Sequence, residues 1–392
     1  MSCRICGSDD LEELIDLGRQ PFANKYPERS KDFADEFFGL LVVNFCNSCL
    51  SAQIIDVHSR DEMFLDYYYL SSVNPGLVDH FTELANELSE SRFVLDIGSN
   101  DGVLLRPLKS NRVPCLGVDP SKNVGALANA EGLQTEIGFF DEAMANKIYK
   151  QVGRPEHIVA SSVVTHLENP HSFFDLCASI LAVDGQLIIE IEYLPAILSN
   201  IQFERFYFDR PHYYSLHGVK KLAEKSGLNL QDAVELKQHG GSVRITLGFQ
   251  NKISEAAQAL LNYEIRNLRR LSGTFASNAK AEMSKLLEFI SDISKRGENI
   301  VGFGCPARFA TITNFGDIGP SLIPHVIDDS PLKVGKFSPG THVPIIEYDW
   351  NTLKSADCIL VFAYEYFDTI KLRLPKTTIG AYRPLPLMKL EP

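Results

Sequence analysis

The sequence has little of what marks nucleic-acid-binding or membrane proteins. Lys and Arg total 38 against 50 Asp and Glu, so the net charge is −12. Such a chain lacks the positive charge of a general nucleic-acid binder and the basic clusters of a membrane-surface protein. Its apolar runs fall far short of the ~20 residues that span a bilayer, and the N-terminus has no apolar signal-peptide core. We therefore expect no nucleic-acid partner, no membrane partner and a cytoplasmic protein.

Internal repeats and low-complexity tracts are also missing from the sequence. The 392 residues are 45% hydrophobic and 22% charged, ordinary values for a soluble globular protein with enough apolar material for sizeable cores. At roughly 100–200 residues per domain, this length predicts two or three domains.

Cysteine is scarce except near the N-terminus, where four of the eight form two pairs, Cys3-x2-Cys6 and Cys46-x2-Cys49. In a reducing compartment such pairs indicate metal ligands more than disulfides. Two thiolates from each pair complete a tetrahedral Zn²⁺ site, and because four thiolates leave no open position, the site is expected to be structural. The alternative is two unrelated thiol pairs. The other four cysteines stand singly in apolar contexts and are expected to be core residues.

From residue 75 onward, helical segments alternate with short apolar strands, a pattern typical of parallel sheets covered by helices. A helix is predicted at 75–90, and a long charged helix at 256–294 connects two α/β units. The predicted strands of the first unit are 93–97, 115–118, 157–161 and 186–190. Those of the second unit are 299–302, 323–327 and 357–362.

The first α/β unit opens with a strand, a glycine-bounded turn and a helix, the place where ligands bind in open parallel sheets. Gly98 and Gly102 allow close approach of the backbone, and Asp96 can order the turn. Asp119 ends the next strand, where a carboxylate can bind ribose hydroxyls. There is no G-x-G-x-x-G and no P-loop lysine here, so this unit does not look like an NAD or P-loop site. The turn resembles that of class I S-adenosylmethionine-dependent methyltransferases; the alternative is an ordinary strand–helix turn.

The full set of motifs resembles the three-domain sugar C-methyltransferases of deoxysugar biosynthesis. The cysteine pairs, the tyrosine-rich segment at 67–72, the Ser-Asn-Asp-Gly of the turn and Gly-Gly-Ser-x-Arg at 240–244 all match, as do Gly-x-Gly-x-Pro-Ala at 302–307 and the motif at 339–344. This resemblance implies a zinc-binding domain (1–70), a Rossmann-like methyltransferase domain (71–250) and a Rossmann-like α/β substrate domain (251–392). The implied cofactor-binding residues are Asp96, Gly98, Asn100, Asp101, Asp119 and Pro120.

One segment departs from the family at the expected active site. Members have Tyr-His-Glu-His, whereas this chain has Tyr207-Phe208-Asp209-Arg210. Arg210 takes the place of the histidine that the family uses as general base, and an arginine stays protonated at neutral pH. His212 or His166, itself a match to a family histidine, is expected to be the base instead. Asp209 would orient the base or the acceptor, or would itself accept the proton if desolvated, and Tyr207 would hydrogen-bond an acceptor oxygen.

The resemblance implies S-adenosylmethionine as cofactor, structural Zn²⁺ and carbon methylation of a nucleotide-linked keto-deoxysugar. Tyr69, Arg210, His239 and Arg244 are the expected substrate-binding residues, and Arg308 and Lys333 could help neutralise a diphosphate. Alternatively, Arg210 grips a carboxylate or phosphate of another acceptor, and the enzyme methylates a non-sugar small molecule. Two rival functions are NAD binding at 302–307, which Pro306 disfavours because it lacks an N–H, and a non-catalytic binding protein.

Overall fold

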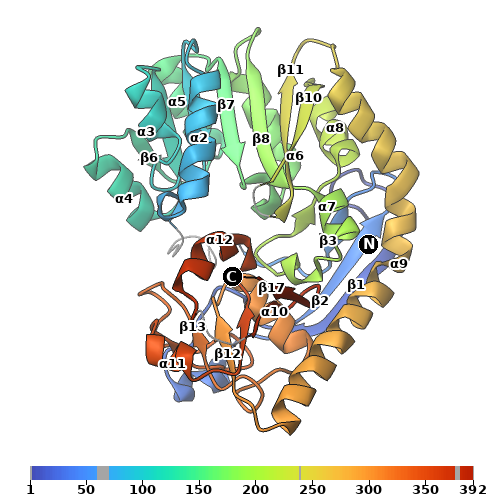
Figure 1. Ribbon diagram of the computed structural model, residues 1–392. Coiled ribbons are helices and arrows are strands. Elements are labelled where there is room, and N and C mark those ends of the chain that lie inside the picture. The colour runs from blue at the N-terminus through green and yellow to red at the C-terminus, as the bar shows by residue number, and fades with distance from the viewer. Residues whose placement is uncertain (1, 60–69, 238–239, 376–379, 392) are drawn as a thin grey trace.

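The computed structural model describes residues 2–59, 70–237, 240–375 and 380–391. It confirms the predicted mixed α/β architecture, with a small N-terminal unit and two larger α/β units (Figure 1). Three sheets organise the chain, and the hydrophobic cores lie between each sheet and its helices.

The N-terminal unit is a four-stranded antiparallel sheet in the order β1-β2-β3-β9. Its first three strands come from the N-terminus, but β9 comes from the distant segment that carries the predicted active site. The strands are β1 (Leu11–Gln20), β2 (Gly39–Cys46), β3 (Ala52–Ile54) and β9 (His212–Tyr213).

The central unit is a seven-stranded sheet in the order β10-β11-β8-β7-β4-β5-β6, in which β11 is antiparallel to both neighbours. Its strands are β4 (Val94–Ile97), β5 (Cys115–Asp119), β6 (Thr135–Ile137), β7 (His157–Ser161), β8 (Gln186–Glu192), β10 (Asn229–Leu236) and β11 (Ser242–Gly248). Its helices are α2 (Pro75–Glu87), α3 (Leu105–Ser110), α4 (Lys122–Ala130), α5 (Glu142–Val152), α6 (Pro170–Ile180), α7 (Leu194–Ser199) and α8 (Leu216–Lys225). α2 and α3 cover one face of the sheet, and α5, α6 and α8 cover the other.

The long helix α9 (Glu255–Lys295) runs along the edge of the molecule and connects the central unit to the C-terminal unit (Figure 1). The C-terminal sheet has the order β14-β13-β12-β15-β16-β17, and its first five strands are parallel. Its strands are β12 (Ile300–Phe303), β13 (Val326–Ile327), β14 (Ile345–Ile346), β15 (Cys358–Val361), β16 (Gly380–Arg383) and β17 (Met388–Leu390). Its helices are α10 (Ala307–Phe315), α11 (Trp350–Lys354) and α12 (Phe367–Ile370).

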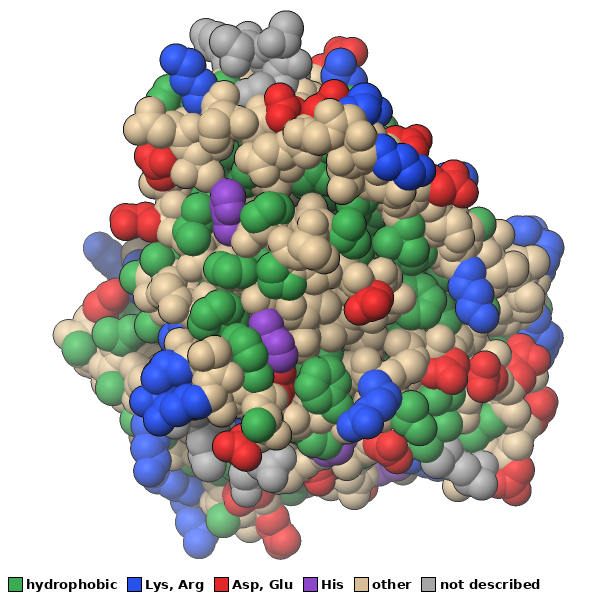
Figure 2. Space-filling model, turned by 90° about the horizontal axis from the view of Figure 1, so that it is seen from below, with side chains coloured by type: hydrophobic (Ala, Val, Ile, Leu, Met, Phe, Trp, Pro, Cys, Tyr) green, Lys and Arg blue, Asp and Glu red, His purple; other side chains and the backbone are tan. Residues whose placement is uncertain are grey.

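All the strands predicted from residue 93 onward are present; β7 has the predicted bounds, and the others have shifted ends. The strand expected at 323–327 begins only at Val326, and Pro324, which has no N–H for a ladder, precedes it. The strand expected at 186–190 continues to Glu192 because Ser242 of β11 pairs with that residue. Among the described helices, none combines the length and apolarity that a membrane span requires. Seen from below, the C-terminal end of the molecule mixes acidic, basic and apolar side chains (Figure 2).

Candidate active site and metal centre

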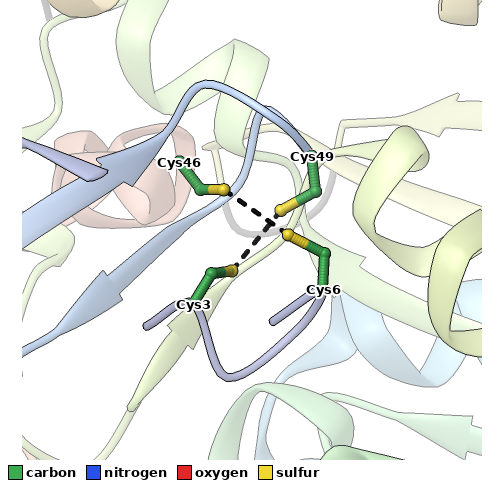
Figure 3. A group of neighbouring side chains, drawn as sticks. All are labelled: Cys3, Cys6, Cys46 and Cys49. Carbon is green, nitrogen blue, oxygen red and sulfur yellow. Dashed lines mark hydrogen bonds between the residues drawn. The ribbon is translucent and has the colours of Figure 1, made fainter. Parts of the chain in front are cut away.

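The four N-terminal cysteines converge on one point (Figure 3). The Sγ atoms of Cys3 and Cys49 are 3.7 Å apart, those of Cys6 and Cys46 are 3.6 Å apart, and all four lie within 4.8 Å of one another. Hydrogen bonding to the Cys49 thiol lowers the pKa of Cys3 to about 7 and that of Cys46 to about 5. Four sulfurs at this spacing suit the tetrahedral coordination of Zn²⁺.

Each cysteine pair lies on a tight turn that closes on its own backbone. The N–H of Gly7 donates to the carbonyl of Cys3 at 2.8 Å, and the N–H of Leu50 donates to that of Cys46 at 2.7 Å. Gly7 and Leu50 both have positive φ. These turns bring the side chains of each pair to the same side, so the two turns form the two halves of one metal site.

The predicted cofactor turn follows β4 and is held by Asp119 at the end of β5. The Asp119 carboxylate accepts the backbone N–H groups of Asn100 and Ser121, both at 2.9 Å. Gly98 has φ +74°, and a Cβ there would lie 2.3 Å from Cγ2 of Val163. Burial, aided by the nearby Asp119, raises the pKa of Asp96 well above its usual range. The residues that the sequence assigned to the cofactor are therefore gathered at one edge of the sheet, with Pro120 directly after Asp119.

Asn100 and Asp101 contact the segment before α2 with their side chains. Oδ1 of Asn100 accepts the N–H of Ser71 at 2.9 Å, and the Asp101 carboxylate accepts both the N–H and the hydroxyl of Ser72. Tyr69, a predicted substrate residue, lies outside the described residues, as does His239. The turn is thus tied to the chain that immediately follows residue 69.

Glu190 near the end of β8 is the centre of a buried ionic network. His80 of α2 contacts both of its carboxylate oxygens at 2.9 and 3.0 Å, and Nε of Arg244 donates to it at 2.7 Å. Although burial opposes ionisation, His80 and Arg244 hold the pKa of Glu190 below its usual value. Arg244 also pairs with Glu87 at 2.8 Å, so this predicted substrate residue already has two carboxylate partners.

The segment after α7 brings the remaining predicted catalytic groups together. Arg210 forms an ion pair with Glu192 at 2.5 Å and lies over the ring of Tyr207, 4.7 Å from its centroid. Nδ1 of His166 contacts the carbonyl oxygen of Asp209 at 2.5 Å. Since a carbonyl only accepts, Nδ1 carries the proton, and Nε2 is the basic nitrogen of the neutral ring. Burial, with the charge of Arg210, lowers the pKa of His166.

His212 lies apart from this group, in β9 of the N-terminal sheet. It pairs in register with Gln53 of β3 and is completely buried. Burial, with the nearby charge of Arg4, lowers its pKa to about 3. A base with so low a pKa matches working pH poorly.

Arg308, which the sequence analysis named, and several residues that it missed join the two α/β units at this point. Arg205 lies between two carboxylates, Glu192 of the central unit at 3.8 Å and Glu365 of the C-terminal unit in a shorter contact. Arg308 donates to the same Glu365 at 2.7 Å, and Tyr364 donates to Glu204 at 2.6 Å. Arg205, Glu365 and Tyr364 have no motif spacing, so only their contacts in the fold identify them. Beside them, a cavity of about 520 Å³ is lined by residues that include Gln202, Gly240, Tyr364, Glu365 and Arg383.

The N-terminal unit contributes Asn24 and Tyr26, which the sequence also did not single out. Nδ2 of Asn24 donates to the Asp209 carboxylate at 2.7 Å, and the Tyr26 hydroxyl donates to the carbonyl of Cys305 at 3.0 Å. Cys305 belongs to the glycine-rich loop after β12, where its N–H donates to Asp328 at 2.7 Å. Lys333 contacts the same Cys305 carbonyl at 3.1 Å. The N-terminal unit therefore contacts both the segment 203–211 and the loop 302–307.

Comparison with known protein families matches almost the whole chain in three consecutive parts. The model described as "Putative zinc binding domain" matches residues 3–64, "Methyltransferase domain" matches 68–233 and "C-methyltransferase C-terminal domain" matches 237–380. C-methyltransferase NovU of Streptomyces niveus is 25% identical over 389 residues, covering 93% of this chain and 90% of that protein.

Three further similar proteins each cover less than half of this chain. A ubiquinone biosynthesis O-methyltransferase of Maricaulis maris is 26% identical over 124 residues, 30% of this chain and 48% of that protein. The solved CcbJ methyltransferase of Streptomyces caelestis covers 47% of this chain and 99% of its own, at 13% identity and a TM-score of 0.37. Magnesium protoporphyrin IX methyltransferase of Synechocystis PCC 6803, solved with bound SAH, covers 44% and 83%, at 15% identity and a TM-score of 0.35.

Proposed function

Because the chain belongs to the zinc-containing, three-domain C-methyltransferases and is an S-adenosylmethionine-dependent enzyme, we propose that its acceptor is a nucleotide-linked keto-deoxysugar, methylated on carbon. The four cysteines hold the structural zinc, and the central unit binds the cofactor through the turn after β4. When bound, S-adenosylmethionine supplies an electrophilic methyl group, and the sulfur keeps the electron pair of the broken bond.

The observation that carries this proposal is the second glycine-rich loop, at residues 302–307. Asp328 accepts the N–H groups of Cys305 and Ser330 at 2.7 and 2.9 Å, just as Asp119 accepts those of Asn100 and Ser121 in the cofactor turn. A carboxylate at the end of the second strand of such a unit is suited to ribose hydroxyls. A nucleoside on this loop would present its attached sugar toward residues 203–211, which we call the acceptor segment.

His166, which follows β7, and Tyr207 and Arg210 of the acceptor segment supply the groups for proton removal. Nε2 of His166 accepts the proton from the carbon beside the ketone, the C–H electron pair becomes the enolate, and that carbon then bonds to the methyl group. The Tyr207 hydroxyl donates to the ketone oxygen, where negative charge develops. Arg210, in place of the family histidine, keeps His166 neutral and thus ready to accept a proton.

Labelled-product analysis tests this function. The protein is incubated with methyl-labelled S-adenosylmethionine and a panel of dTDP-, GDP- and CDP-linked 4-keto-deoxysugars, and the products are analysed by mass spectrometry. We expect one labelled methyl group on carbon of one sugar nucleotide. An Asp119→Ala variant, assayed at a cofactor concentration well below its weakened Kd, serves as the control with little bound cofactor. Label on oxygen, or on no member of the panel despite cofactor binding, would contradict the proposal and would indicate a different acceptor.

A further inference from the structure

The first zinc-binding turn reaches directly to the acceptor segment through Arg4, which lies between Cys3 and Cys6. The Arg4 guanidinium donates to the carbonyl of Ile54 at 2.5 Å and to that of Pro211 at 3.2 Å. The Pro211 carbonyl also accepts the N–H of Ile54 at 3.1 Å. Arg4 therefore joins the zinc site, the end of β3 and the residue next to Arg210.

The backbone of Arg4 is itself held on both sides. Its N–H donates to Oε1 of Gln53 at 2.9 Å, and Nε2 of His171 in α6 donates to its carbonyl at 3.1 Å. The two cysteines of this turn, Cys3 and Cys6, would both be ligands of the metal. The direction of the guanidinium is thus fixed by the same turn that holds the metal.

Strand β9 connects the N-terminal sheet to the predicted active-site residues. It is the fourth strand of the N-terminal sheet, and its Tyr213 pairs in register with Ala52 of β3. The Tyr213 hydroxyl donates to the carbonyl of Arg205 at 3.0 Å and accepts the N–H of Tyr207 at 3.1 Å. The turn that presents Tyr207 and Arg210 is therefore built on a strand of the zinc-bearing sheet.

The second zinc-binding turn has contacts of a different kind. Its Cys49 carbonyl accepts the Ser215 hydroxyl at 2.7 Å, its Ser48 carbonyl accepts Lys221 of α8 at 2.8 Å, and its Asn47 carbonyl accepts Arg269 of α9 at 2.9 Å. These contacts anchor the metal site to the helices behind the sheet. The hydrogen bonds to the Pro211 carbonyl come from Arg4 of the first turn and from Ile54.

We propose that Arg4 is a positioning residue for methyl transfer, and that the zinc site controls the acceptor segment through it. This inference rests on the proposed function in assigning Tyr207 and His166 to the acceptor. The cofactor turn after β4 has no contact with Arg4, so the cofactor binds independently of this support. Misplacement of catalytic groups by about 1 Å costs roughly 100-fold in rate, so losing the support lowers kcat and leaves cofactor affinity unchanged.

The test compares Arg4→Met with Arg19→Met. Arg4→Met keeps the length of the side chain but removes the hydrogen-bond donors, and Arg19 is an exposed arginine of β1. Zinc content, the Kd for S-adenosylmethionine and amide hydrogen exchange are measured on the full chain. We expect one zinc per chain and an unchanged Kd in both variants. In Arg4→Met alone, exchange of peptides spanning 205–214 rises at least tenfold, while peptides spanning 94–102 are unaffected.

Activity with an acceptor provides the second readout. We expect kcat to fall about 10- to 100-fold in Arg4→Met with KM for the cofactor unchanged, and Arg4→Lys, which keeps one donor and the charge, to recover part of it. If Arg4→Met does not fold, Arg4→Lys is tested in its place. For Arg4→Lys we expect a smaller rise in amide exchange at 205–214 than the tenfold rise expected for Arg4→Met.

Unchanged exchange at 205–214 overturns the proposal, as does a loss of zinc and cofactor binding together with activity, which would show a general role in folding. The exchange and binding measurements need no acceptor. A failure of the proposed sugar acceptor is therefore distinguishable from a failure of this inference.

Discussion

The central and C-terminal units have the same order of parallel strands but differ in the residues that follow the fourth strand. Their sheets share the order third, second, first, fourth and fifth strand, and a glycine-containing turn follows the first strand in each. The N–H of Gly98 donates to Val118 at 2.7 Å, and the N–H of Gly304 donates to Ile327 at the same distance. Both glycines have positive φ. The similarity of the two turns supports the proposal that each of them holds a nucleoside.

The units differ after the fourth strand, which faces the turn. A Cβ on Gly98 would lie 2.3 Å from Val163, and one on Gly304 would lie 2.4 Å from Ala363. Three residues further on, the central unit has His166 and the C-terminal unit has Tyr366. On the proposed function, the turn would bind a nucleoside in both units, and the residues after the fourth strand would decide which unit performs chemistry.

The largest effect should come from the residue that distinguishes the units. We expect His166→Asn to lower kcat about 100- to 10,000-fold, because the general base is lost, with the Kd for S-adenosylmethionine unchanged. Tyr366→Phe is the matched control at the equivalent position and should leave kcat within about twofold, as expected for a group outside proton transfer. Steady-state kinetics and calorimetry check both. Full activity in His166→Asn would show that another residue is the general base.

Removing the carboxylate of the cofactor turn should have the next largest effect. Asp119→Ala loses the acceptor of two backbone N–H groups and the group suited to ribose. We expect the affinity for S-adenosylmethionine to fall about 100-fold, equivalent to about 2.7 kcal/mol, measured by calorimetry. If the affinity stays within threefold, the turn does not hold the cofactor in this way.

The equivalent change in the C-terminal unit should affect the other substrate. Asp328→Ala removes the acceptor of the Cys305 and Ser330 N–H groups. We expect KM for the nucleotide-linked acceptor to rise about tenfold, or about 1.4 kcal/mol, and the cofactor affinity to be unchanged. The effect is smaller because the loop is also held by Tyr26 and Lys333. If the cofactor affinity changes instead, the two units do not bind the cofactor and the acceptor separately.

Local patterns were sufficient to predict much of this arrangement. The alternation of strands and helices gave both α/β units, and the spacing of the cysteines predicted the cluster that the fold assembles. The turns could be located because Gly98 and Gly304 stand at the ends of buried strands. These features depend on residues close together in the sequence, where periodicity and turn chemistry are decisive.

Contacts between distant segments could not be predicted in the same way. Nothing in the sequence around Arg4 indicates that it donates to Pro211, and Asn24 carries no signal of its contact with Asp209. Arg244 was assigned to the substrate from its motif, but its side chain is paired with Glu190 and Glu87 because the register of β11 against β8 places it there. Such pairings follow from sheet order and register, which the sequence pattern does not specify.

The smallest predicted effect is on the pH dependence of catalysis in the central unit. Burial and Arg210 lower the pKa of His166, and a general base acts in its neutral form. The acid limb of kcat/KM should therefore lie below pH 6.5, the ordinary histidine value.

Arg210→Gln removes a nearby positive charge and leaves Glu192 beside the ring. Both changes favour the protonated imidazole, so the pKa rises and the acid limb moves to higher pH, with a smaller change in activity above pH 8. The pH profiles of wild type and Arg210→Gln, measured at saturating cofactor, check this shift. An acid limb that stays in place or moves to lower pH would remove His166 as the titrating base and would weaken the distinction between the two units.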